Sequence, residues 1–478
     1  MISEKRELKY DKIKKKVYAK EDFIMRNQLT RIEKKKLREK DKGIIDFVKM
    51  QNHFFPNLIK ELGKVKDPRK ENYTEYTSAE LMYPVILKNS CNLESMRQMT
   101  EWFEDANCAS NLGKLIGRKI ENIPHYDTIN NFLERLETNE INKVRIEMLK
   151  KLIRSKTFYQ ARMAENQWMV ILDGTGLYHF REKHCDNCLV KEITDKEGNK
   201  KKIYYHSVLE AKIVMADNII ISMGTEFIEN ESENVEKQDC EIKASKRLLK
   251  RIKGEFPRLK ICILGDSLYA AESIIDICKE YDWNYLLRCK EGRQKNLILD
   301  YGYILENGEY GEKKNLLEEE KGTAKYVNHV EEITGKNFKA NIFEYEYEQI
   351  NNRTNTKNTV KFHWITDIDL TNRNIEEMVK CARKRWKIEN EGFNTQKNIL
   401  YKIEHLNSKN PNAMKNHYLL TQITDILMQL YLAGTKVLKE LKQAIKNTSS
   451  RLLETFRQAI VTDEDVSYIK KYTTVHFT

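Results

Sequence analysis

Two short apolar runs, each followed closely by an aspartate, constrain the fold of this chain more than any other feature. Residues 168–172 (WMVIL) lead directly into Asp173, and residues 260–264 (KICIL) are followed by one glycine and then Asp266. A short apolar run that ends in turn residues is typical of a buried strand that leaves its sheet. Because a helical pattern over about 235–252 separates the two runs, the sequence predicts a mixed α/β sheet.

The apolar and polar patterns divide the chain into consecutive segments. Lys and Arg dominate the start, helical periodicity lies on both sides of the α/β region, and the residues after Val461 have the composition of a loose tail. We therefore expect a basic arm (1–40), a helical domain (41–165), the first part of an α/β core (166–290), a β-rich insertion (291–358), the second part of the core with a helix that carries Glu389 (359–400) and a C-terminal helical region (401–478).

The chain is basic, because 84 Lys and Arg outnumber 72 Asp and Glu and give a formal net charge of +12. This excess favours a polyanionic partner, since Lys and Arg release counterions from phosphates; a basic surface that only keeps the protein soluble is the alternative. No run approaches the ~20 apolar residues of a membrane helix, and no apolar signal-peptide core stands at the start. We therefore expect a cytoplasmic protein. We also expect no nucleotide cofactor, because the chain has no Gly-rich phosphate loop.

Three acidic residues stand where two-metal chemistry would place its ligands. Asp173 and Asp266 follow predicted strands, and Glu389 lies in a helix predicted over about 375–397, one turn after Arg385. Clustered carboxylates can hold two Mg²⁺ or Mn²⁺ ions ~4 Å apart, which activate an attacking oxygen and stabilise the leaving oxygen in phosphoryl transfer. Each residue also has a structural explanation, namely a strand-end turn, a helix cap and an ion pair with Arg385.

Three sequence blocks carry a family resemblance. They are residues 171–176 (ILDGTG), 264–269 (LGDSLY) and 385–394 (RWKIENEGFN). In this order they resemble the three blocks of DDE insertion-sequence transposases, in the subgroup with a β-strand insertion and a Tyr-Arg-Glu-Lys signature. The spacing agrees, since 93 residues separate the first block's aspartate from the second's, and 123 separate the second from Glu389, which leaves room for the insertion.

The resemblance implies a fold, an activity and partners. The fold would be a ribonuclease-H-like mixed sheet with a β-rich insertion, flanked by N- and C-terminal helical regions. Asp173, Asp266 and Glu389 would hold two Mg²⁺ (or Mn²⁺) ions, Arg385 would bind a DNA phosphate, and Trp386 would pack beside it. The enzyme would cut the ends of a bacterial-type insertion element and join them to target DNA. It would act as a nucleoid-associated homodimer on paired ends, with the helical domain recognising the terminal repeats.

The chain departs from the family signature at two positions. Ala382 stands in place of the Tyr, and Gln396 stands in place of the Lys, with Lys397 next to it. On an ideal α-helix Gln396 shares the stripe of Glu389, and Lys397 is turned by about 80°; a long Lys can still reach a phosphate, and we assign this role to Lys397. Lys290 follows a predicted strand and is a candidate for contact with DNA; the alternative is an ordinary surface lysine. Two alternatives stay open: a ribonuclease-H-like nuclease that joins no DNA, and an inactive transposase descendant that only binds it.

A Cys-x-x-Cys pair outside these blocks is a candidate metal site. Cys185, Cys188 and His206 are three residues of the types that hold a structural zinc ion. His184 is an alternative histidine, and Cys240 is a fourth ligand if the fold brings it near. Two reduced thiols in a loop are the alternative, as is usual for cysteines in a reducing compartment.

Overall fold

The computed structural model describes residues 31–40, 42–70, 74–194, 197–232, 235–318, 320–331, 339–351, 356–441, 444–473, 475 and 477. Up to position 30 the predicted basic arm lies outside the described residues, and its end forms helix α2 (Arg31–Lys40). Within the described ranges, no helix combines the length and the apolar character needed to cross a membrane.

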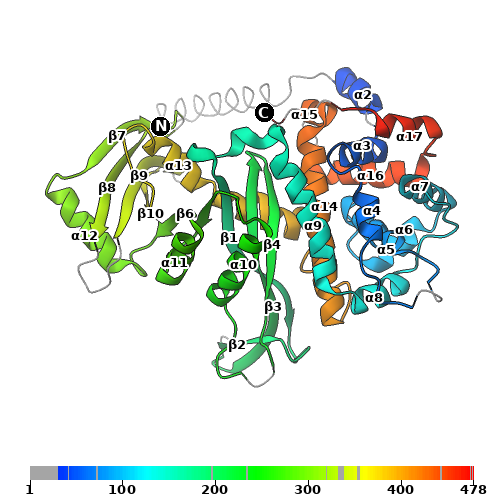
Figure 1. The fold of residues 1–478 in the computed structure, drawn as a ribbon, viewed down its shortest axis with the longest axis horizontal. Helices are drawn as coiled ribbons and strands as arrows, with labels where there is room; N and C mark the ends of the chain where they lie inside the picture. Colours follow the sequence, from blue (N-terminus) through cyan, green and yellow to red (C-terminus); the bar gives the residue numbers. More distant parts are fainter. Residues whose placement is uncertain are drawn as a thin grey trace, which may run out of the picture.

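A ten-stranded mixed sheet runs through the molecule (Figure 1). Its hydrogen-bonded order is β2-β3-β1-β5-β6-β10-β9-β8-β7, with β4 paired to β3. β3 is antiparallel to β1 and β4, whereas β1, β5 and β6 are parallel. The predicted mixed α/β fold with flanking helices is confirmed. The strands are β1 (Trp168–Phe180), β2 (Leu189–Thr194), β3 (Lys200–Ala216), β4 (Ile219–Ile228), β5 (Ile261–Gly265), β6 (Asn284–Cys289), β7 (Gly311–Leu316), β8 (Gly322–Glu331), β9 (Lys339–Asn351) and β10 (Thr356–Thr366).

The first half of β1 is apolar throughout because both faces of the sheet are covered there. Val170 and Leu172 belong to the main core, whereas Met169 and Ile171 belong to a second core on the opposite face. Helices α10 (Glu241–Glu255) and α11 (Glu272–Tyr281) contribute to the main core, and α13 (Ile375–Arg383) contributes to the second. Strands covered on both faces lack the alternation of a half-exposed strand, so the continuous apolar runs in the sequence follow from this layering.

The segment between β6 and α13 continues the sheet. Helix α12 (Lys295–Glu306) comes first, and β7 to β10 follow as antiparallel neighbours. β10 also pairs with β6, where Ile365 lies opposite Leu287. The β-structure expected over 291–358 is thus present, together with a helix that the polar sequence did not indicate, and it forms one sheet with the core.

Helices from both ends of the chain form one layer beside the sheet (Figure 1). The long helix α14 (Pro411–Gly434) contacts α3, α5, α8, α9 and strand β4. It is buried on nearly all sides, as expected of a helix without a polar face. The segments 41–165 and 401–478 therefore pack against one another. The other helices of the layer are α3 (Ile44–Phe54), α4 (Leu58–Gly63), α5 (Ser78–Ser90), α6 (Met96–Phe103), α7 (Ala106–Ile116), α8 (Tyr126–Arg135), α9 (Thr138–Arg154), α15 (Lys436–Leu441), α16 (Ile445–Gln458) and α17 (Asp463–Lys470).

The prediction of a loose tail after Val461 is wrong. Residues 463–470 form α17, which begins with a capping box between Thr462 and Asp465. The helix packs against α3, where the side-chain amide of Asn52 donates to the carbonyl of Ile469 over 3.2 Å. A short helix with a single fully buried residue leaves too weak an apolar pattern for the sequence to indicate it.

A buried polar network joins the helical layer to the sheet. Arg145 on α9 is 2% exposed, and it donates to Ser222 Oγ over 2.7 Å and to Thr225 Oγ1 over 2.5 Å. Both hydroxyls, which lie on β4, donate to the carboxylate of Glu210 on β3 over 2.5 Å. Burial raises the pKa of Glu210, and the positive charge of Arg145 opposes this rise. The two opposite charges therefore stabilise each other in the interior.

Candidate active site

Asp173 and Asp266 lie level with each other on neighbouring parallel strands. β1 and β5 pair with Ile171 opposite Leu264, so each aspartate follows its paired residue by two positions and takes the same face of the sheet. Neighbouring strands are about 4.8 Å apart. Asp266 stands just after β5, and its Oδ1 accepts a hydrogen bond from the backbone N–H of Leu268 over 2.8 Å. The register therefore brings both carboxylates to one edge of the sheet.

Glu389 reaches the same edge from a helix of unusual geometry. The helix predicted over about 375–397 is present but not continuous: α13 ends at Arg383, a turn at 384–385 interrupts it, and after two helical residues it continues as a π-helix, η4 (Ile388–Ile399). Arg385, in the turn, lies between two acidic residues: its Nη1 is 3.9 Å from Asp173 Oδ2 and 3.2 Å from Glu389 Oε1. π-Helical turns are rare and frequently occur at functional sites. Asp173 and Glu389 thus share one guanidinium group.

The π-helix determines which of two neighbouring residues lies on the side of the aspartates. Gln396 is fully buried, and its amide donates to Asp425 Oδ2 on α14 over 2.8 Å. Lys397 instead lines a cavity of about 470 Å³, together with Glu241 and the glycine after Asp173. A π-turn holds more residues than an α-turn, so the angular positions of an ideal α-helix do not apply here. The hydrogen bond from Gln396 to Asp425 holds one side of η4 against α14. Lys397, the next residue, lines the cavity on the other side.

Glu241, at the start of α10, is a fourth carboxylate that the sequence did not indicate. Its Oε2 accepts a hydrogen bond from the buried hydroxyl of Tyr269 over 2.9 Å. Its side chain lies against Gly174, where an added Cβ would be 2.6 Å from Oε1. The glycine after Asp173 therefore makes room for Glu241. An acidic residue in the first turn of a helix usually just complements the helix dipole, so no sequence signal marked this one.

Burial and neighbouring charges act together on Asp173. Burial raises its pKa to about 7, Arg385 opposes the rise, and Glu389, Glu241 and Asp266 add to it. Burial also raises the pKa of Glu241, and the charge of Asp266 adds to that rise. Glu389, Glu241 and Asp266 therefore all lie within electrostatic reach of Asp173. A buried carboxyl group whose pKa is raised by neighbouring carboxylates favours a bound cation.

Two arginines and a tryptophan border the carboxylates. The guanidinium groups of Arg288 on β6 and of Arg385 lie 5.9 Å and 5.2 Å from the ring centroid of Trp386. Burial and the charge of Arg385 lower the pKa of Arg288, while Asp266 and Glu389 oppose the change. The Nε atoms of both arginines are buried without a hydrogen-bond partner, and Trp386 is 41% exposed. This border offers cationic donors and an open aromatic face.

Lys290 lies apart from this group. It is exposed after β6, and its backbone carbonyl accepts hydrogen bonds from the N–H groups of Arg293 and Gln294 in the turn that leads to α12. Arg288, two residues earlier, is the basic residue of this strand whose pKa is affected by the carboxylates of Asp266 and Glu389. The sequence did not identify it, because an arginine within an apolar strand gives no indication of which face it occupies.

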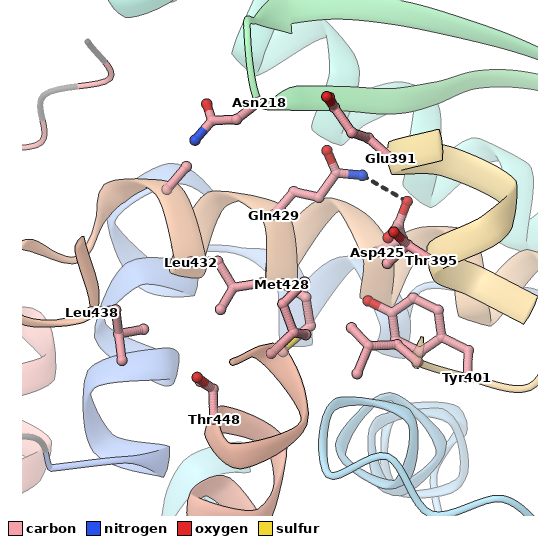
Figure 2. Close-up of a pocket in the computed structure, with 13 residues that line it drawn as sticks. Asn218, Glu391, Thr395, Tyr401, Asp425, Met428, Gln429, Leu432, Leu438 and Thr448 are labelled. Carbon is pink, nitrogen blue, oxygen red and sulfur yellow. Dashed lines mark hydrogen bonds between the residues drawn. The ribbon is translucent and has the colours of Figure 1, made fainter. Parts of the chain in front are cut away.

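A second cavity, of about 390 Å³, lies between η4 and the C-terminal helices (Figure 2). Glu391 and Thr395 of η4 contribute to its wall, and in it Gln429 donates to Asp425 Oδ2 over 2.9 Å. None of the three predicted metal ligands lines it. This second cavity lies where η4 faces the C-terminal helices, whereas the cavity lined by Lys397 and Glu241 adjoins the carboxylates.

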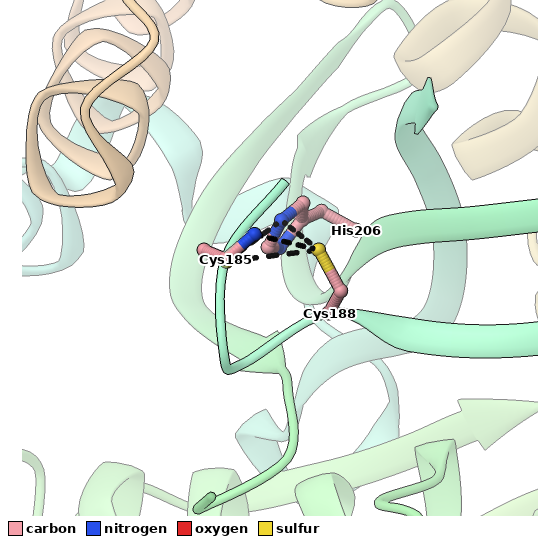
Figure 3. Close-up of side chains that lie close together, drawn as sticks. All are labelled: Cys185, Cys188 and His206. Carbon is pink, nitrogen blue, oxygen red and sulfur yellow. Dashed lines mark hydrogen bonds between the residues drawn. The ribbon is translucent and has the colours of Figure 1, made fainter. Parts of the chain in front are cut away.

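The structure brings Cys185, Cys188 and His206 together (Figure 3). The two Sγ atoms are 3.7 Å apart, and each is 3.4 Å from Nε2 of the histidine. Burial lowers the pKa of His206 to about 4, so its ring is neutral at pH 7. Cys240 is exposed and does not belong to this cluster, and His184 stacks on a phenylalanine ring beside it.

Comparisons with known proteins give two family matches. Residues 168–424 match the family described as a transposase DDE domain, and residues 59–148 match the one described as DDE_Tnp_1-associated. Among solved structures, the cryo-EM structure of the piggyBac transposase synaptic complex with hairpin DNA is similar at a TM-score of 0.40 and 10% sequence identity, over 90% of this chain and 82% of that chain. No curated protein matches the sequence. The first family match covers more than half of the chain and includes Asp173, Asp266 and Glu389.

Proposed function

The chain belongs to the transposase family defined by the DDE domain, and we propose that it is the transposase of a bacterial-type insertion element, which cleaves DNA at the element ends and joins the freed 3′ ends to target DNA. The observation that supports the proposal most is that residues far apart along the chain lie around Arg385, which is 3.9 Å from Asp173 and 3.2 Å from Glu389, while the strand register places Asp266 beside Asp173. The four carboxyl groups and two arginines at this edge have the composition expected of a phosphoryl-transfer site.

Members of this family generally use divalent metal ions, and the residues present fit such ions. Mg²⁺ and Mn²⁺ prefer oxygen donors, and the raised pKa of Asp173 reflects a buried site in which negative charges disfavour one another. We propose that Asp173, Asp266 and Glu389 hold two Mg²⁺ (or Mn²⁺) ions. Bound there, the ions would lower the pKa of the attacking water or 3′ hydroxyl and stabilise the leaving oxygen.

The cationic side chains of this site bind and orient the DNA. The guanidinium groups of Arg385 and Arg288 lie by the ring of Trp386, and a guanidinium group is a suitable donor to phosphate oxygens. Lys397 supplies a further positive charge from the cavity wall. The exposed face of Trp386 offers a stacking surface for a base, and Lys290, exposed at the end of β6, lies where DNA further from the cut would pass.

DNA is the partner that the net charge of +12 favours. We propose that the protein binds the terminal repeats of its element and the target DNA, with the N-terminal helices recognising the repeats. We further propose a homodimer that holds two paired ends. The mass of the complex with end DNA, measured by light scattering, tests this assembly: one chain per complex would contradict it.

Cleavage and joining of the flanking element ends test the proposed function. Purified protein, end DNA and Mg²⁺ are incubated with a supercoiled plasmid as target. Transposase activity gives nicked ends and plasmids joined to the end DNA. Cleavage without joined products would instead support a ribonuclease-H-like nuclease, and binding without Mg²⁺-dependent cleavage would support an inactive descendant, for which the missing Tyr at Ala382 and the missing Lys at Gln396 are the reason to consider it.

Lys397→Ala is expected to lower the rate of end cleavage by roughly 10- to 100-fold, the value of one charged hydrogen bond to a phosphate. Lys397 pairs with Glu404 in the DNA-free protein over 2.7 Å, a half-exposed pair whose loss should leave folding almost unchanged. Single-turnover cleavage rates and the salt dependence of DNA binding measure the effect. Lys409→Ala, at an exposed lysine nearby, is the matched control. Equal rates for both variants would remove Lys397 from the site.

Metal affinity is expected to fall as the pH falls below about 7. A proton and a metal ion compete for Asp173, whose pKa is raised to about 7 by burial and the nearby carboxylates, so binding releases a proton in this range. Titration of Mn²⁺ by calorimetry at pH 5.5 to 8 measures both effects. Because ionisation of a group with a raised pKa opposes folding, Asp173→Asn should also raise the Tm of the metal-free protein at pH 8. Equal Mn²⁺ affinity at pH 5.5 and pH 8 would contradict this account.

A further inference from the structure

The cluster of Cys185, Cys188 and His206 has the dimensions of a zinc site. A tetrahedral ion with Zn–S of about 2.3 Å and Zn–N of about 2.0–2.1 Å requires S–S and S–N separations of about 3.8 Å and 3.6 Å. The structure shows 3.7 Å between the sulfurs and 3.4 Å from each sulfur to Nε2. These three separations agree with tetrahedral geometry, although the three residues come from two different segments.

The chemistry of the donors selects the metal. Two cysteine sulfurs and an imidazole nitrogen are soft and borderline ligands, which suit Zn²⁺ and are unlike the oxygen donors of the carboxylate site. The cysteine sulfurs carry no disulfide. We propose that Cys185, Cys188 and His206 bind a structural Zn²⁺ ion, with release of the two thiol protons. His184, whose Nε2 is buried without a hydrogen-bond partner and whose ring centroid is 6.2 Å from that of His206, is a further candidate donor, and water can complete the coordination.

The position of the cluster indicates what the ion would stabilise. Both cysteines lie in the loop between β1 and β2, while His206 lies on β3, opposite Tyr178 of β1. The loop is also tied to the end of β4, where Asn230 donates to the carbonyl of Cys188 over 3.0 Å. The ion would thus join loop and sheet at the base of the ribbon formed by β2 and the start of β3.

This ribbon extends away from the rest of the sheet (Figure 1), and it is basic. Lys191 of β2 lines the same cavity as Lys397 and Glu241, and three exposed lysines begin β3, at positions 200–202. A two-stranded ribbon is marginally stable on its own, so an ion at its base would hold these lysines in place. Only this last step, the use of the lysines for DNA, rests on the proposed function; the metal site does not.

Metal analysis of the full-length protein tests the inference. Protein produced with zinc in the medium and purified without a histidine tag should contain one Zn²⁺ per chain, and Cys185→Ser/Cys188→Ser should contain less than a tenth of that. Cys240→Ser is the matched control, since this exposed cysteine lies outside the cluster, and it should keep the ion. Replacement by Co²⁺ should give the charge-transfer absorption of a cobalt–thiolate bond, which carboxylates cannot produce.

A second measurement on the wild-type protein covers the case in which the double variant fails to fold. Zn²⁺ should slow alkylation of Cys185 and Cys188 at least tenfold, and should leave Cys240 unchanged, as followed by peptide mass spectrometry. The inference is overturned if reduced wild-type protein takes up neither Zn²⁺ nor Co²⁺ through thiolates, or if the ion persists in the folded double variant. Loss of transposition with the zinc content intact would contradict only the proposed function.

Discussion

Replacing Asp173, Asp266 or Glu389 by alanine is expected to lower the rate of end cleavage by at least about 1,000-fold, which corresponds to about 4 kcal/mol of lost transition-state stabilisation. Each of the three is a proposed ligand of the metal ions, and alanine supplies no oxygen donor in its place. The loss should appear in cleavage and in joining alike, because one set of ligands serves both. Single-turnover assays with pre-cut and uncut end DNA separate the two steps.

The control for this prediction is Glu391→Ala. Glu391 lies on the same π-helix as Glu389, and its side chain is 46% exposed. It forms an ion pair with Lys387 over 3.3 Å. Its loss should change cleavage less than threefold. DNA binding should survive in all four variants, and Asp173→Ala should not lower the Tm, since it removes a carboxyl group whose pKa burial raises. Cleavage by Asp173→Ala at the wild-type rate would exclude Asp173 from the mechanism.

Arg145→Ala is expected to destabilise the protein by about 3–5 kcal/mol, the range for breaking a buried charged network from one side. The variant removes the larger of the two positive charges, Arg145 and Lys212, that oppose the raised pKa of Glu210, and it leaves the hydroxyls of Ser222 and Thr225 without their donor. Urea unfolding followed by fluorescence and by circular dichroism measures the change. If the helical layer and the sheet unfold separately in the variant, the two signals will no longer coincide.

A double-mutant cycle distinguishes this network from ordinary packing. Arg145→Met combined with Glu210→Gln should be more stable than the sum of the two single variants predicts, because neither charge is then left alone in the interior. Lys143→Ala is the control on the same helix; the Lys143 side chain is 60% exposed, and ion pairs of surface lysines contribute little. A loss below about 1 kcal/mol for Arg145→Ala would show that the network does not hold the layers together.

The sequence was sufficient to predict the two buried strands, because burial on both faces leaves a continuous apolar run. The predicted turn at Asp173-Gly174 is wrong, since β1 continues through Asp173 to Phe180 and pairs there with β3. Residues 168–172 and 260–264 could each be assigned without knowing their neighbours, and the aspartate after each followed from chain order alone. Residue type and spacing also indicated the cluster of Cys185, Cys188 and His206, because a Cys-x-x-Cys pair with a histidine is typical of a metal site.

Residues that join the site through tertiary contacts left no such pattern. Glu241 reads as the first residue of a helix, and only the packing of α10 against Gly174 brings it to Asp173. Arg288 lies in an apolar strand whose exposed face depends on the sheet. The π-helix depends on Gln396, which bonds to a helix that comes later in the chain. In each case the deciding partner is distant in sequence, and local propensity carries no information about it.

The position of α14 has a consequence for how the protein is made. The N-terminal helices emerge from the ribosome first, but α3, α5, α8 and α9 share the partner α14, which follows the entire catalytic sheet. The N-terminal helices also contact one another, but until α14 has been synthesised the faces that pack against it stay uncovered in the nascent chain. We therefore expect chaperone occupancy on these faces to end only after α14 has been synthesised, so that a chain broken off before α14 leaves the N-terminal helical domain without its main partner.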